Sequence, residues 1–283
     1  MSYRFAVVGH PVAHSRSPDI PHAFARQLGL SVQYDAVDLP EDGFESGIQA
    51  LIEAGYQGFN VTLPHKEHAY VWVSEHSQRA QLAGAVNTLM PTEHGPGWRG
   101  DNTDGQGLVH DLTQIQGLDL SGKRLLILGA GGAVRGVLGP LLECRPQRLH
   151  IANRTAARAE SLAAHFAPQS SAGHCALTAG GFDQSKDEFD LVINGTSASL
   201  GGDIPPVPSS VFAANAHAYD MMYGPGTTPF NAWALAQSVA GSSDGLGMLV
   251  GQAAESFRLW TGRAPDVAPV LAQVRKQLKA EAG

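Results

Sequence analysis

The chain has 283 residues, of which 43% are hydrophobic and 16% charged, enough for two ordinary domains with buried cores. Its net charge of -7 at pH 7 argues against a general nucleic-acid-binding protein, which would carry a basic surface. Two cysteines without a CxxC spacing are too few for a disulfide framework, and no apolar run reaches about 18 residues, so we expect a cytoplasmic protein without a membrane segment.

Short β-rich runs alternate with amphipathic helical stretches along the chain, which is typical of an α/β protein with mostly parallel sheets. In the first third, the pattern predicts strands at 3–9, 32–38, 57–62 and 85–92, and helices at 18–28, 41–54, from about 64 onward, and from the 101–105 segment to about 115.

The middle third begins again after a connector at 117–122. A strand at 123–128, a glycine-rich turn, a helix to about Glu143 and a strand at 148–152 form a βαβ unit of the usual length. Further segments are a loop at 201–208, strands at 189–194 and 216–221, and helices over 246–278 with a break at 262–266.

The glycine-rich turn is Gly129-Ala130-Gly131-Gly132-Ala133, between a buried strand and a helix. Glycines let the backbone approach a pyrophosphate, and the helix N-terminus supplies free N–H donors. Val134 stands where the GxGxxG pattern has its third glycine. The strand, turn and helix together favour a dinucleotide site over a purely structural turn.

The end of the second strand indicates which dinucleotide binds. An NAD site usually has an acidic residue there for the ribose 2′-hydroxyl. Here the sequence is Asn153-Arg154-Thr155 with Arg158 one turn later, and no acid precedes Glu160. Arginines suit a 2′-phosphate, so we expect NADP. A strand end followed by a helix cap with solvated arginines would explain Thr155 but not the missing acid.

Several polar segments interrupt the apolar pattern. In His14-Ser15-Arg16-Ser17-Pro18, Ser17 suits an N-cap and Pro18 the first helical position, and the same helix start can also bind a carboxylate.

Asn60 and Thr62 end a buried strand, and Lys66 follows in the first turn of a helix. A cation there opposes the helix dipole, which would ease proton release near neutral pH, although a solvated lysine remains an alternative. Asp104 is either an N-cap or a partner that orients this lysine. Asn87 places an amide in a strand that otherwise resembles core.

His65 and His68 form an HxxH pair without a third ligand. We therefore expect exposed histidines and no metal site.

The motifs HSRSP, NVTLPHKE, AGAVNT, GDNTDG, GAGGA, NRT, YDMMY and DGLGMLVGQAA together resemble the shikimate dehydrogenase family along nearly the whole chain. The resemblance implies a mostly parallel substrate domain of residues 1–104, to which 246–283 return, and a Rossmann-type NADP domain of residues 105–245. The active site would lie in the cleft between them. The implied activity is the reversible, NADP-dependent interconversion of 3-dehydroshikimate and shikimate, on the route to chorismate and aromatic amino acids.

The resemblance also implies roles for single residues. Lys66 would be the general acid/base and Asp104 its partner, Ser15 and Ser17 would bind the substrate carboxylate, and Tyr223 would lie near it. Two larger sets follow: Asn60, Thr62, Asn87, Asp104 and Gln252 for the ring hydroxyls, and residues 129–133, Asn153, Arg154, Thr155, Arg158, Thr196, Met221, Gly245 and Met248 for NADP. Two positions depart from the family pattern. Gln78 stands where many members carry an acid, and Gly195 replaces a small side chain.

Two alternatives remain open. One is a quinate/shikimate dehydrogenase with a broader substrate range and often NAD, against which Arg154-Thr155 argues. The other is a non-catalytic NADP-binding sensor, which would not need both Lys66 and Asp104. The expected partner is a small molecule, with neither nucleic acid nor membrane, and the chain would be a monomer or a homodimer.

Overall fold

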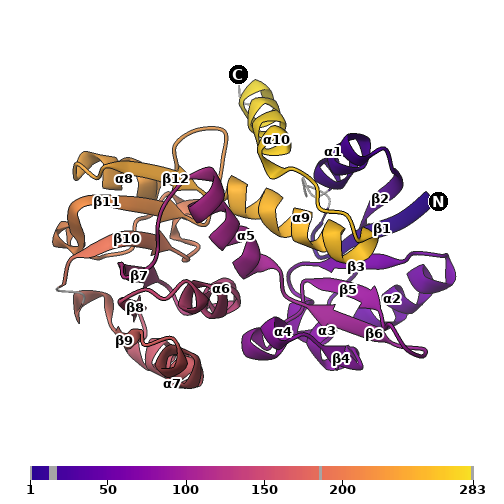
Figure 1. The fold of residues 1–283 in the computed structure, drawn as a ribbon, viewed down its shortest axis with the longest axis horizontal. Coiled ribbons are helices and arrows are strands. Elements are labelled where there is room, and N and C mark those ends of the chain that lie inside the picture. Colours follow the sequence, from indigo (N-terminus) through magenta and orange to yellow (C-terminus); the bar gives the residue numbers. More distant parts are fainter. Residues whose placement is uncertain (1, 13–17, 185–186, 282–283) are drawn as a thin grey trace. The chain divides into compact units, whose positions relative to one another are not determined.

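The structure, a computed structural model, describes residues 2–12, 18–184 and 187–281 (Figure 1). These residues divide into two units. The first contains Met1–Gly107 and Val250–Val274, and the second contains Leu108–Leu249 and Arg275–Gly283. Arg275 Nη1 donates to Asp244 Oδ2 at 2.7 Å within the second unit.

The first unit is built on one six-stranded sheet (Figure 1). Its strands are β1 (Ser2–Gly9), β2 (Ser31–Asp38), β3 (Gly58–Val61), β4 (Glu75–His76), β5 (Thr88–Pro91) and β6 (Trp98–Asp101). Its helices are α1 (Asp19–Leu28), α2 (Phe44–Glu53), α3 (Lys66–Trp72), α4 (Gln78–Ala83) and parts of α5 (Asp104–His110), α9 (Leu246–Thr261) and α10 (Val267–Glu281). The strand order is β2-β1-β3-β5-β6-β4.

Antiparallel pairing of β5 with both of its neighbours aligns three strand ends in the first sheet. Asn60 of β3 lies opposite Thr88 of β5, and Thr88 lies opposite Asp101 of β6. The β5–β6 hairpin runs from this row to the pair Pro91–Trp98 at its other end. The row therefore brings the segments around Asn60, Asn87 and Asp101 together.

Both faces of this sheet are covered at β1, where successive side chains point to opposite faces and the four residues 5–8 are all apolar and buried. Ala6 and Val8 belong to a core with Phe59 and Val86, whereas Phe5 packs on the other face against Trp260 of α9. The Trp260 indole donates to Leu89 O at 2.9 Å. Gly58 permits this approach, since a Cβ there would lie 2.6 Å from Trp260 Nε1.

The second unit has another six-stranded sheet, with every neighbouring pair parallel. Its strands are β7 (Arg124–Leu128), β8 (Arg148–Ala152), β9 (Ala176–Gly180), β10 (Phe189–Asn194), β11 (Phe212–Asp220) and β12 (Gly241–Asp244), and its connecting helices are α6 (Gly132–Glu143), α7 (Ala156–Ala172) and α8 (Pro229–Ala236). The strand order is β12-β11-β10-β7-β8-β9, so β8 and β9 are added on one side of β7 and β10 to β12 on the other, as in doubly wound nucleotide-binding folds. The predicted α/β class with mostly parallel sheets is confirmed.

Several predicted bounds change for local reasons. Pro18 lies at the N-cap of α1 and not at its first helical position. α2 begins at Phe44 because Gly43 N bonds to Pro40 O and closes a turn first. The helix predicted to about Ile115 is α-helical only to His110, and Asp111–Ile115 form a π-helical turn.

The buried Asp111 occupies this π-helical turn. Its carboxylate accepts from Tyr219 Oη at 2.7 Å and from Gln116 Nε2 at 3.0 Å. Burial raises the pKa of Asp111. The two donors satisfy a carboxylate that has little access to water.

An ion pair between neighbouring strands predicts how stability depends on pH. Arg124 donates from its N and Nη2 atoms to Asp190, both at 2.8 Å, and this lowers the pKa of Asp190. A carboxyl with a lowered folded-state pKa stabilises the fold above its unfolded pKa of about 3.9, and loses this contribution as pH falls through the folded value. Asp190→Asn should therefore lower the thermal unfolding midpoint near neutral pH, and the deficit should shrink below about pH 4. Calorimetric scans across this range, with the exposed Asp42→Asn as control, test this; a deficit independent of pH would contradict it.

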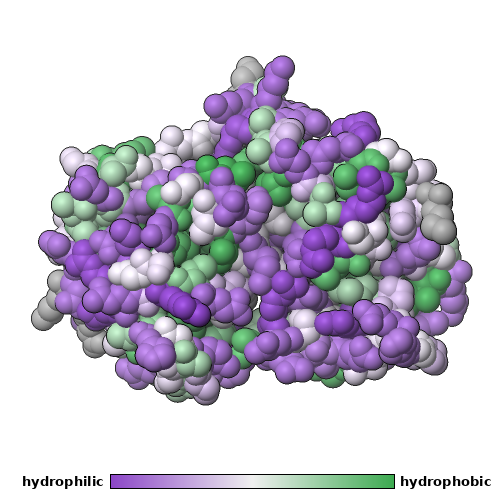
Figure 2. All heavy atoms as spheres, viewed as in Figure 1, coloured by the Kyte–Doolittle hydropathy of each residue, from purple (hydrophilic) through white to green (hydrophobic). Residues whose placement is uncertain are grey.

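The drawn face of the molecule is mostly hydrophilic, and its hydrophobic residues lie in smaller groups (Figure 2). Among the described residues, no helix is both long enough and apolar enough to cross a membrane.

Candidate active site

Lys66 and Asp104, 38 positions apart in the sequence, form an ion pair in the first unit. Lys66 is the first residue of α3 and Asp104 the first residue of α5, and these helices follow β3 and β6, the two strands on either side of β5. Lys66 Nζ lies 2.6 Å from Asp104 Oδ2, and the two side chains are 27% and 11% exposed. The Lys66 amine is thus held by a carboxylate, and both side chains remain partly exposed.

Asn87 holds the other oxygen of Asp104. Its Nδ2 donates to Asp104 Oδ1 at 2.8 Å, while its Oδ1 accepts from Thr103 N at 2.9 Å. The Asn87 backbone N donates to Asp101 O at 3.0 Å. Asp104 is therefore fixed on two sides, by an amide and by an ammonium.

Asn60 is tied into a buried polar row. Tyr34 Oη donates to Asn60 Oδ1 at 2.7 Å, and Asn60 Nδ2 donates to Ser256 Oγ at 3.0 Å and to Asn87 O at 3.2 Å. Burial raises the pKa of Tyr34 above its usual range, so its hydroxyl remains a donor. The orientation of the Asn60 amide is thereby set by the protein.

The other predicted substrate residues are placed as follows. Thr62 directly follows β3 and is half-buried. Gln252 lies on α9, with its Oε1 at 3.3 Å from Asn87 Nδ2. Tyr223 belongs to the second unit, and Ser15 and Ser17 lie outside the described residues. The geometry thus brings Lys66, Asp104, Asn87, Asn60 and Gln252 together.

The expectation of two exposed histidines is wrong for His65. Its side chain is buried, its Nε2 lies 2.9 Å from Leu39 O, and its ring packs against Phe44. His68 is exposed. Within the described part of the chain, no group of three or more His, Cys, Asp or Glu side chains is arranged to bind a metal.

The glycine turn connects β7 to α6 in the second unit. Gly129 has a φ of +111°, which L side chains rarely adopt, and a Cβ there would lie 3.1 Å from Gly195 O. At Gly131 and Gly132, by contrast, no described heavy atom lies within 4 Å of the Cβ position. Open space beside the N-terminus of a twelve-residue helix fits a pyrophosphate.

The predicted 2′-phosphate residues follow β8, which pairs with β7 so that the two strands end together. Arg154, Thr155 and Arg158 are exposed, and Asn153 is half-buried with its Nδ2 bonded to Thr155 O at 2.9 Å. Thr155 occupies the N-cap of α7 but makes no side-chain capping bond. Helix capping therefore does not explain this residue, and the exposed guanidiniums fit NADP.

Val134 and Gly195 are both unusual residues of the nucleotide-binding unit, and their sizes are complementary. A Cβ on Gly195 would lie 2.4 Å from Val134 Cγ2 and 3.1 Å from Met221 Sδ. Val134, which replaces the third glycine of the motif, thus fills the space that a side chain at 195 would need. Gly245 is similarly tight, since its Cβ would lie 2.1 Å from Met221 O. Thr196, after β10, donates from Oγ1 to Asn194 Oδ1 at 2.7 Å, and Met248 lies in the first turn of α9.

Two sets of interacting, buried polar residues were not predicted from the sequence. One joins Asn194, Ser199 and Asp220 at the ends of β10 and β11, where Ser199 Oγ donates to Asp220 Oδ2 at 2.7 Å. The other joins Arg79 to Asp101. Asp220 within YDMMY, an acid directly after the apolar Ala218 and Tyr219, was the available signal for the first set, whereas Asp101 follows Trp98-Arg99-Gly100 and has no such signal.

Comparisons with known proteins place the chain among described families. Family models match at residues 7–89 (shikimate dehydrogenase substrate binding domain), 111–200 (shikimate / quinate 5-dehydrogenase) and 245–275 (shikimate 5'-dehydrogenase C-terminal domain).

Individual relatives match over nearly their full length. The chain is 50% identical to the shikimate dehydrogenase (NADP(+)) of Alkalilimnicola ehrlichii, over 98% of this chain and 100% of the relative. It is 52% identical to that of Methylobacillus flagellatus, over 96% and 98%. The crystal structure of shikimate 5-dehydrogenase from Thermus thermophilus in complex with NADP(H) and shikimate has a TM-score of 0.83 and 35% identity, covering 98% of this chain and 100% of that one. The chain belongs to the shikimate dehydrogenase family.

Proposed function

We propose that this protein is an NADP-dependent shikimate dehydrogenase that reversibly reduces 3-dehydroshikimate to shikimate. The observation that carries the proposal is the 2.6 Å contact between Lys66 Nζ and Asp104 Oδ2, in a chain of this family. A protein that only binds NADP would not need a proton donor held by a carboxylate and an amide.

When bound, NADP supplies or accepts the hydride. Lys66 holds the proton that the ketone oxygen acquires as its carbon is reduced, and takes this proton back in the reverse direction. Asp104 keeps the ammonium oriented, and Asn87 keeps Asp104 from rotating away. A positioned general acid of this kind typically contributes about 10²–10⁴-fold to the rate, and correct orientation of the reactants contributes much of the rest.

The polar residues of the first unit match the chemistry of the proposed substrate. A ligand with one carboxylate and three oxygen-bearing ring carbons needs many neutral donors and acceptors. Asn60, Thr62, Asn87 and Gln252 supply amide and hydroxyl groups, and we assign the carboxylate to Ser15 and Ser17, with Tyr223 near it. The first unit would thus bind substrate.

The second unit would bind the nucleotide. Its glycine turn, residues 129–133, would receive the pyrophosphate at the N-terminus of α6. Arg154 and Arg158 would pair with the 2′-phosphate, together with Asn153 and Thr155. Thr196, Met221, Gly245 and Met248 would line the nicotinamide end.

An assay with two substrates and two cofactors tests the proposal. We expect fast NADPH formation, followed by absorbance, with shikimate and NADP, and at least tenfold lower kcat/KM with NAD or with quinate. Comparable turnover of quinate with NAD would favour a quinate/shikimate dehydrogenase. Binding of NADP without turnover of either acid would favour a sensor.

A further inference from the structure

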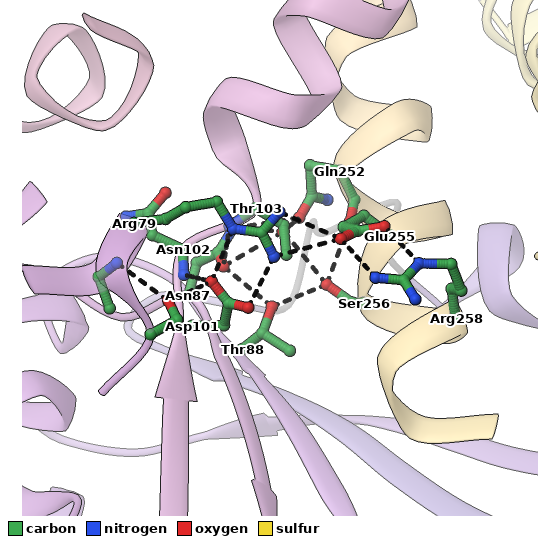
Figure 3. A network of polar contacts seen from close by, with 12 residues as sticks. Arg79, Asn87, Thr88, Asp101, Asn102, Thr103, Gln252, Glu255, Ser256 and Arg258 are labelled. Atoms are coloured by element: carbon green, nitrogen blue, oxygen red, sulfur yellow. Dashed lines mark hydrogen bonds and ion pairs between the residues drawn. The ribbon is translucent and has the colours of Figure 1, made fainter. Parts of the chain in front are cut away.

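A buried carboxylate lies three residues before Asp104. The Asp101 side chain is only 4% exposed, at the end of β6. Arg79 donates to both of its oxygens, from Nε to Oδ1 at 3.0 Å and from Nη2 to Oδ2 at 2.6 Å (Figure 3). Ser77 Oγ and Asn102 N add bonds to Oδ1 at 2.6 Å and 2.7 Å. Asp101 is thus fully bonded, with one bidentate partner.

Arg79 also reaches the helix that carries Gln252. Its Nη1 and Nη2 each lie 3.2 Å from Glu255 Oε1 on α9, and Arg258 pairs with the same carboxylate (Figure 3). Glu255 lies next to Ser256, whose Oγ is 2.7 Å from Thr88 Oγ1 and 3.0 Å from Asn60 Nδ2. One guanidinium therefore connects α4, the end of β6 and α9 within the first unit.

Arg79, Arg258, Asp101 and Glu255 form a cluster of two positive and two negative side chains, whose charges balance. Burial would raise the pKa of Asp101, but the bonds and charge of Arg79 outweigh it, so that the pKa is lowered. Both acids therefore stay ionised and need their partners. A planar guanidinium fixes direction as well as distance, which an ammonium does not.

Short links lead from Asp101 to the catalytic pair. Asn102 N donates to Asp101 Oδ1, and Asn102 Oδ1 accepts from Asp104 N at 3.2 Å. The Asp101 backbone O also accepts from Asn87 N at 3.0 Å, and Asn87 holds Asp104. A shift of Asp101 would therefore move the Asp104 backbone through Asn102, and the Asn87 amide that holds the Asp104 carboxylate.

We infer that Arg79 is a positioning residue for the reaction, which fixes Asp104 against Lys66 through Asp101 and fixes Gln252 through Glu255. This inference rests on the proposed function. Arg79 bonds to Asp101 and Glu255, so its effect on the reaction is transmitted through them.

Alanine and lysine variants of Arg79 test this role, at a temperature where circular dichroism shows each to be folded. Arg79→Ala should lower kcat by about 10–100-fold, since a displacement of about 1 Å can cost 10²-fold. The pH dependence of kcat should also change, because Asp104 is no longer fixed against the proton-transferring Lys66. Free guanidinium at low, non-denaturing concentration should restore much of the lost kcat, and Arg79→Lys should remain impaired. The KM for NADP should not change.

Arg263→Ala is the matched control, because it removes an exposed arginine of the same unit and leaves the Arg79–Asp101 and Arg79–Glu255 pairs intact. We expect its kcat to stay within twofold of the parent value and its pH profile to be unchanged. A folded Arg79→Ala with the parent's kcat and pH profile would overturn the inference. If that variant does not fold, Arg79→Lys decides in the same way. Failure of the proposed function is distinguishable, because the unmodified protein would then show no turnover of shikimate.

Discussion

Replacement of Lys66 by alanine is expected to lower kcat for NADP-linked shikimate oxidation by about 10²–10⁴-fold, with shikimate affinity nearly unchanged. The lysine Nζ lies 2.6 Å from Asp104 Oδ2 and is the proposed carrier of the transferred proton. Neutral amides and hydroxyls, which the substitution leaves in place, provide most of the ligand contacts. NADPH absorbance gives kcat, and calorimetric titration with shikimate gives the affinity.

The exposed Lys276→Ala on α10 is the control for loss of a positive charge, and it should behave like the parent protein. Asp104→Asn should also lower kcat, and the double variant should lose much less than the product of the two single effects, because the residues act as a unit. A Lys66→Ala protein with full turnover would remove the lysine from the mechanism. An additive double variant would show that the two residues act separately.

The second large effect concerns cofactor choice. Arg154→Ala with Arg158→Ala should raise the KM for NADP by about 10²–10⁴-fold, because two charge-assisted hydrogen bonds to a phosphate contribute about 1.5–3 kcal/mol each and every 1.4 kcal/mol is about tenfold. The KM for NAD should stay the same, since NAD lacks the 2′-phosphate. The two side chains are exposed, so their removal leaves no buried partner behind.

Initial rates with both cofactors measure this change in preference. Arg263→Ala, an exposed arginine of the first unit, is the control for a general change in charge and should alter neither KM. An equal rise in both KM values would mean that the arginines act on a part that both cofactors share, and would remove the 2′-phosphate assignment.

Elements with a continuous apolar run could be predicted closely from the sequence. β8 and β10 have their predicted bounds, because each is a buried central strand flanked by polar residues. β9 was missed, since it is partly exposed and pairs only with β8, and β4 has just two residues. Such strands exist because a neighbouring strand offers hydrogen bonds, which local sequence does not encode.

Some residues of the candidate site could also be predicted from the sequence, and others could not. The Lys66–Asp104 pair could be predicted in part, because a lysine in the first turn of a helix opposes the helix dipole and is easily noticed, whereas the acid alone could equally be an N-cap. The Arg79–Asp101 pair could not be predicted, because an arginine on a six-residue polar helix looks like a solvated surface residue. Its partner Asp101 lies in the 101–105 segment, where a helix was predicted to begin and an acid is ordinary. Only the pairing of β4 and β6 beside α4 reveals that the two meet.

The β5–β6 hairpin has an exposed tip that lies well away from the candidate site at its other end. Its catalytic end is fixed by the pairing of Thr88 with Asp101, while Pro91 and Trp98 lie three residues further along each strand, about 10 Å away. The tip between them, including Glu93, His94 and Gly95, is exposed. A reporter dye or an affinity peptide attached there would leave the register of the site intact, which makes this tip a suitable handle for immobilising or labelling the enzyme.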